Sequence, residues 1–182
     1  MVYIPLVILI VLVVWFVAVY NGLVRLRNQV KNAWHQIDVQ LKRRHDLIPN
    51  LVEVVKDYMA YEQETLTKVI EARSAALNAK GPQAQAKAEN FLTESLKSLF
   101  AVVEKYPDLK ANQNVASLQE ELTGTENKIS FARQFFNDSV MSYNNKIQTI
   151  PSNIIASMFN FAQETFFQAE EADRAVPRAS LR

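Results

Sequence analysis

The fold is decided by the N-terminal stretch VYIPLVILIVLVVWFVAVY, residues 2–20, in which fourteen side chains are Val, Ile, Leu or Phe. No charged side chain occurs in residues 1–24. As a helix, this stretch spans about 28 Å, close to the thickness of the hydrocarbon core of a bilayer. Burying the fourteen apolar side chains in lipid is worth roughly −6 kcal/mol. Residues 1–24 are therefore the predicted transmembrane anchor.

A lone strand and a cleaved signal peptide are the alternatives to a helical anchor for this stretch. Ten of the fourteen residues are Val or Ile, which favour strands. A lone strand leaves its backbone groups unpaired in lipid, so helix is the better prediction. A cleaved signal peptide would carry a basic region before the apolar run and a small-residue cleavage site after it. Neither is evident, so we predict an uncleaved anchor.

The residues that follow the span set its orientation. Arg25, Arg27 and Lys31 come directly after it, and nothing charged precedes it. The positive-inside rule therefore predicts a single-pass protein with its C-terminal body in the cytoplasm.

Composition limits the function classes that remain. The 182 residues suffice for one domain. The 20 Lys and Arg against 19 Asp and Glu give a net charge of +1, which supplies no basic field for nucleic acid. The chain has no cysteine, which excludes disulfides, thiolate metal sites and thiol nucleophiles.

The rest of the chain has the apolar periodicity of long helices. The first amphipathic helix continues from the span through Leu26 and Ile37 to Val69. Pro49 lies inside it, so we expect a kink there or a restart near Asp46, and we favour the kink. The sequence NAKGP at residues 78–82 predicts a helix stop and a reversal of the chain.

Further helices are predicted over residues 83–106 and 109–149, with a short one over 153–167. Gly124 lies in the second of these, and Thr123 with Glu126 could cap a fresh helix start there. Each amphipathic helix needs a partner for its apolar stripe. The predicted fold class is all-α: one transmembrane helix continuing into a long-helix antiparallel bundle over residues 25–167, followed by a flexible tail over 168–182.

The basic residues near the membrane divide into two groups. Arg25, Arg27 and Lys31 lie within reach of anionic lipid head groups. Arg43 is roughly 27 Å farther along an upright helix, so Lys42, Arg43 and Arg44 need other partners. The plain interpretation is a solvated helix face paired with Glu on neighbouring helices, and the alternative is a contact site for a partner or a second subunit.

No motif indicates catalysis, and neither a cofactor nor a metal is predicted. His35, Asp38 and His45 do not form a convergent set of metal ligands. Asn137 and Asn144, one heptad apart beside an apolar seam, are predicted to set helix register.

Several blocks of the sequence resemble the LemA family. They are YNGLVRLR at 20–27, AWHQIDVQLKRR at 33–44, DLIPNLV at 46–52, LQEEL and TENKI within 118–129, and FNDSV and YN within 136–144. The resemblance covers about residues 20–167. It implies a bacterial single-pass membrane protein with a bundle of long helices and no established enzymatic activity. It also implies association with HtpX-type membrane proteases, with TPM-domain proteins or, in magnetosome-forming bacteria, with membrane biogenesis. The predicted location is the inner (cytoplasmic) membrane.

These observations favour a non-enzymatic, membrane-anchored scaffold or adaptor that self-associates or docks another membrane protein, such as an HtpX-type protease. Self-association as a homo-oligomer is suggested by an apolar stripe on the first helix that is longer than the second helix can cover. The alternative is a membrane-shaping or lipid-organising protein whose partners are membrane lipids, bound through Arg25, Arg27 and Lys31.

Overall fold

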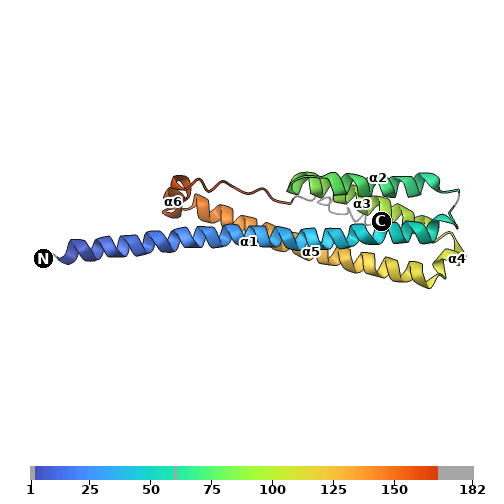
Figure 1. The fold of residues 1–182 in the computed structure, drawn as a ribbon, viewed down its shortest axis with the longest axis horizontal. Helices are drawn as coiled ribbons and strands as arrows, with labels where there is room; N and C mark the ends of the chain where they lie inside the picture. Colours follow the sequence, from blue (N-terminus) through green and yellow to red (C-terminus); the bar gives the residue numbers. More distant parts are fainter. Residues whose placement is uncertain (1–2, 60, 168–182) are drawn as a thin grey trace, which may run out of the picture. The chain divides into compact units, whose positions relative to one another are not determined.

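The computed structural model describes residues 3–59 and 61–167. This part of the chain is helical without strands, which confirms the all-α prediction (Figure 1). The helices are α1 Tyr3–Lys56, α2 Gln63–Asn78, α3 Pro82–Val103, α4 Pro107–Lys110, α5 Gln113–Gln148 and α6 Ser152–Met158. The predicted tail over 168–182 lies outside the described residues.

The chain divides into two compact units. Among the described residues, the first unit comprises 3–39 and Ser130–Phe166, and the second comprises 40–59, 61–129 and Phe167. The long helices α1 and α5 each contribute one part to either unit. The predicted domain boundaries at residues 24 and 167 stay predictions.

The N-terminal part of α1 has the length and composition needed to cross a membrane. Among the described helices it alone does so, and none of its most apolar window is buried within the chain. Its large apolar side chains Tyr3, Ile4 and Leu6 to Val14 are 53–78% exposed. A core helix of a soluble protein would be covered by its neighbours, so this segment differs from one.

Pro49 does not end α1, because the helix runs without interruption from Tyr3 to Lys56. The expected alternative of a restart near Asp46 is therefore wrong. A proline inside a helix cannot donate to the carbonyl four residues earlier, which here is the carbonyl of His45. The Arg73 side chain of α2 donates to that oxygen instead, with 2.8 Å between Nε and O. An interaction from another helix thus satisfies the carbonyl that the proline leaves open.

The first amphipathic helix is shorter than expected. It ends at Lys56. The apolar positions Leu66 and Val69, which the periodicity assigns to the same helix, belong to the separate helix α2. The backbone N–H groups of Tyr58 and Met59 both donate to the carbonyl of Val55, which closes a turn. Met59 is fully buried in that turn. No Gly or Pro lies in this turn, so the local sequence does not predict the end of the helix. The burial of Met59 by distant residues stabilises the turn instead.

The second unit is built around an antiparallel hairpin of α2 and α3, which pack against each other (Figure 1). Gly81 adopts a φ of 84° between them, a left-handed conformation that glycine tolerates, as the stop signal predicted. The apolar core draws on α1, α2, α3, α4 and α5, with Ile48, Leu51, Val69, Leu92 and Leu99 each fully buried.

Gly124 does not interrupt α5, which runs from Gln113 to Gln148. The expected alternative of a helix start at Thr123 is therefore wrong. The Thr123 hydroxyl donates to the carbonyl of Gln119 one turn earlier, at 2.8 Å, so it acts within the helix and not as a cap. Glu126 is used elsewhere, in an ion pair described below.

The first unit pairs α1 and α5 in antiparallel fashion. Trp34 stacks edge-on against Phe136, with 5.5 Å between ring centroids, and Gln29 donates to Ser139 at 3.4 Å.

The predicted last helix is shorter than expected, because α6 ends at Met158. The non-helical residues after it are held against α5, where the Tyr143 hydroxyl donates to the carbonyl of Ala162 at 2.9 Å.

Prediction for Arg73 and Pro49. Replacing Arg73 by Met removes the donor to the His45 carbonyl and should lower the free energy of unfolding by about 1–3 kcal/mol. In a Pro49→Ala background, residue 49 regains an N–H that can serve the same oxygen, so R73M should cost clearly less. Urea unfolding of the full chain in detergent, followed by circular dichroism, measures this double-mutant cycle. An equal cost in both backgrounds would contradict the assigned role of Arg73.

Candidate functional site

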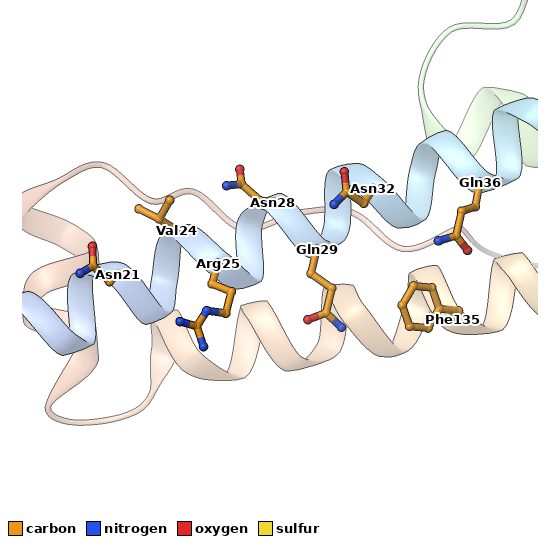
Figure 2. Close-up of a pocket in the computed structure, with 8 residues that line it drawn as sticks. All are labelled: Asn21, Val24, Arg25, Asn28, Gln29, Asn32, Gln36 and Phe135. Atoms are coloured by element: carbon orange, nitrogen blue, oxygen red, sulfur yellow. The ribbon is translucent and has the colours of Figure 1, made fainter.

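A polar groove lies on α1 directly after the apolar segment, within the first unit. It has a volume of about 520 Å³ and is lined by Asn21, Val24, Arg25, Asn28, Gln29, Asn32 and Gln36 of α1 and by Phe135 of α5. Figure 2 shows Arg25 and Gln29 extending from α1 toward α5, and Phe135 extending from α5 toward α1. The α1 residues recur at spacings of three and four, so helix geometry alone places them on one face.

The groove offers hydrogen-bond donors and one positive charge. Five of its lining side chains are amides, which both donate and accept, and Arg25 adds a guanidinium. No Asp or Glu lines it. This chemistry suits phosphate or another anionic polar group. Sequence reasoning identified Arg25 but missed the amides, although their helical spacing was visible.

The three basic residues predicted to meet lipid head groups are not equivalent. Arg25 and Lys31 are exposed. Arg27 is half-buried, and its guanidinium carbon lies 5.0 Å from the centre of the Phe161 ring, a cation–π contact. Its Nε atom is buried without a hydrogen-bond partner. The structure therefore brings Arg25 into the groove and turns Arg27 toward the packing of the first unit.

The second group of basic residues is also divided. Arg44 is buried in the second unit, only 3% exposed. Its Nη2 donates to the Thr93 hydroxyl at 2.7 Å, and its Nη1 lies 3.4 Å from Glu89 and 2.8 Å from Glu126. Arg44 thus links α1 to α3 and α5. Of the expected partner contacts, Lys42 and Arg43 are exposed, and Arg44 is engaged inside the unit.

His45 extends this buried network. Its Nε2 lies 2.8 Å from Glu89, and Gln85 donates to the same carboxylate oxygen at 2.9 Å. Glu89 is itself only 2% exposed. A buried carboxylate needs partners such as these, because its desolvation is otherwise costly. His45 therefore serves the packing of α1 against α3, whereas His35 is exposed on α1.

The two predicted register residues lie on the first-unit part of α5. Asn144 is buried and makes two hydrogen bonds with the backbone of Glu164: its Nδ2 donates to the carbonyl at 2.9 Å, and its Oδ1 accepts from the N–H at 3.0 Å. It holds the segment after α6 in place. Asn137 is half-buried. Nearby, burial raises the pKa of the Tyr143 hydroxyl, and the Glu164 carboxylate adds to the rise.

These features define a class: a helical protein whose first helix can cross a membrane and carries a polar groove just beyond the apolar segment. The chain belongs to the LemA family, whose model matches residues 33–180. It is 29% identical to protein LemA of Metamycoplasma hominis, over 89% of this chain and 75% of that protein. It is 23% identical to magnetosome protein MamQ 2 of Paramagnetospirillum magneticum and 22% identical to magnetosome protein MamQ of Magnetospirillum gryphiswaldense. Each MamQ alignment covers 84% of this chain and 66% of the relative.

Prediction for the buried ion pairs. Replacing Arg44 by Met leaves Glu89 and Glu126 without their guanidinium and should lower the free energy of unfolding by about 3–5 kcal/mol. Arg43→Met is the matched control on the next residue. Arg43 lies 3.8 Å from Glu121 and both side chains are more than half exposed, so the change should stay within about 0.5 kcal/mol. Urea unfolding of both variants checks this, and equal effects would show that Arg44 does not hold the helices together.

Proposed function

We propose that this protein is a non-enzymatic, membrane-anchored helical scaffold or adaptor that docks another membrane protein on the cytoplasmic side of the inner membrane. The supporting observation is that α1 is one unbroken helix from the apolar segment to Lys56. The segment suited to anchoring and the proposed docking residues Lys42 and Arg43 therefore belong to the same helix.

The use made of the ionisable side chains supports a structural role. Ion pairs among α1, α3 and α5 engage Arg44, His45, Glu89 and Glu126. Lys42 and Arg43, beside them, face outward. The pair of Arg43 with Glu121 is too long and too exposed to contribute much, so little is lost when Arg43 turns to an acidic partner. Family resemblance makes an HtpX-type membrane protease one candidate for that partner.

The packing within the chain does not require self-association. The apolar stripe of α1 beyond the membrane segment is already buried, with Leu23, Ile37, Ile48 and Leu51 each 0% exposed. A second copy is therefore not needed to cover it. Docking through Lys42 and Arg43 is the better-supported form of the scaffold proposal, with a second copy of the chain as one outcome of its test.

Prediction for docking. A photo-crosslinking residue placed at Lys42 or Arg43 of the full chain should capture a membrane protein in native membranes. The same residue at Asn50, exposed on the same helix, is the matched control and should capture far less. The double charge reversal K42E/R43E should weaken co-purification of the captured protein several-fold, because charge complementarity is lost.

Mass spectrometry of the products decides between the outcomes. A different membrane protein supports an adaptor, and a second copy of this chain supports self-association. Products that are equal at all three positions, or absent from all three, would contradict docking at Lys42 and Arg43.

A lipid-organising role is the second proposal, and the polar groove favours it. Arg25 lies in the groove among five amides, immediately after the apolar segment, and Lys31 is exposed nearby. Phosphate head groups of anionic lipids fit this set of donors, and each basic residue near the surface is worth about 1 kcal/mol of attraction. Arg27, held over Phe161, is less available for head groups than the sequence suggested.

Prediction for lipid selection. The variant R25E/K31E should carry several-fold less anionic lipid than the parent when the full chain is extracted with its surrounding bilayer and the lipids are quantified. The variant K42E/R43E changes the net charge equally and should keep the parental lipid ratio. The difference should shrink in high salt, because surface charges are screened. Equal lipid content in both variants would contradict the lipid-organising proposal.

A further inference from the structure

The short helix α6 and the residues next to it carry a largely exposed apolar surface. This α6 surface consists of Ile150, Ile154, Met158 and Phe159, which are 83%, 62%, 63% and 44% exposed. The opposite side of α6 is packed, with Ile155 and Ala156 buried. One helical turn separates Ile154 from Met158, so both lie on the same outward face.

The contacts of Phe159 fix the level of the α6 surface along α1. The Phe159 ring lies 4.8 Å from the ring of Tyr20 and 6.0 Å from the ring of Phe16, centroid to centroid. Tyr20 and Phe16 precede Arg25, the first charged residue of α1, by about 8 and 14 Å of helix axis. Phe159 therefore lies on the apolar side of the first charge, beside the membrane-spanning segment.

The chain around α6 is free of charge. Residues 147–163 contain no Asp, Glu, Lys or Arg, and the flanking charges are Lys146 and Glu164. A surface meant for water usually carries charged side chains, whereas interfacial segments present apolar side chains and keep their basic residues at head-group level. The uncharged, largely apolar stretch around α6 matches the second pattern.

Hydrogen bonds tie both ends of the segment that carries the α6 surface to α5. The Ser152 hydroxyl donates to the carbonyls of Lys146 and Thr149, at 2.6 and 2.9 Å, which ties the start of α6 to the end of α5. At the other end, Tyr143 and Asn144 bind the backbone of residues 162 and 164. Both ends of the segment are thus fixed to α5.

We propose that the α6 surface inserts into the interfacial layer of the bilayer that α1 spans, as a second, shallow membrane contact. The occupant of this surface is lipid, because its level is that of Phe16 and Tyr20, where the medium around a spanning helix is the bilayer. Interfacial helices bury their apolar faces about 5–10 Å into the boundary between head groups and acyl chains, which matches this level. The inference rests on the membrane anchoring included in the proposed function.

Because the chain has no cysteine, single labels can be placed without removing native residues. The variants I154C, V11C and F131C each carry an environment-sensitive fluorophore on the full chain in vesicles of phosphatidylcholine with phosphatidylglycerol. Val11 lies in the apolar segment of α1, and Phe131 is a 72% exposed residue of α5 in the same unit as α6. Quenchers attached at shallow or deep positions of the lipid chains, and iodide in the water, report the depth of each label.

The label at 154 should be quenched more strongly by the shallow lipid quencher than by the deep one, and should be several-fold less accessible to iodide than the label at 131. The label at 11 should respond to the deep quencher. If the label at 154 behaves like that at 131, or is shielded from iodide without any quenching by lipid, as a protein partner would cause, the insertion of α6 is overturned. A label at 11 that no lipid quencher reaches would instead overturn the anchor itself, so the two failures are distinguishable.

Discussion

The apolar side chains along the first turns of α1 need an apolar medium around them. From Tyr3 to Val14 they are more than half exposed, and no other described part of the chain covers them. Water would make this exposure costly by roughly 25 cal/mol per Å², whereas lipid removes the cost and also requires a fully hydrogen-bonded backbone, hence a helix. The proposed lipid contacts depend on closeness to this segment. This holds for the polar groove, for Arg25 and Lys31, and for the α6 surface.

Farther along α1, stability depends on polar contacts that other helices supply. His45 is the residue where two of them meet, because its ring binds Glu89 of α3 and its carbonyl accepts from Arg73 of α2. The second contact is needed because Pro49 follows four residues later. Buried ionic networks of this kind add little net stability, but they penalise any arrangement that leaves a charge unpaired. We therefore expect the network to fix how α1 packs against α2, α3 and α5 in the second unit.

Much of the helical architecture could be predicted from apolar periodicity, since both the length of the apolar segment and the stop at Gly81 are local signals. The turn after Lys56 could not, because it depends on the burial of Met59 by distant residues. Likewise, a helix restart near Pro49 or a fresh start at Gly124 stayed open from the sequence, whereas tertiary contacts and the surrounding helix sustain α1 and α5 through both residues. In the candidate site, the charge pattern identified Arg25 but did not show that Arg25 is exposed and Arg27 half-buried. It likewise did not show that Lys42 is exposed and Arg44 buried. Which side chain a helix buries depends on the helices packed against it.

We propose that the apolar segment stays attached and continues into the helical body as one anchor. The decisive measurement is mass spectrometry of the protein recovered from carbonate-washed membranes of the producing cells. The chain should remain in the membrane pellet and yield peptides that include residues 3–24. Recovery of a soluble chain that begins after the apolar segment would contradict it.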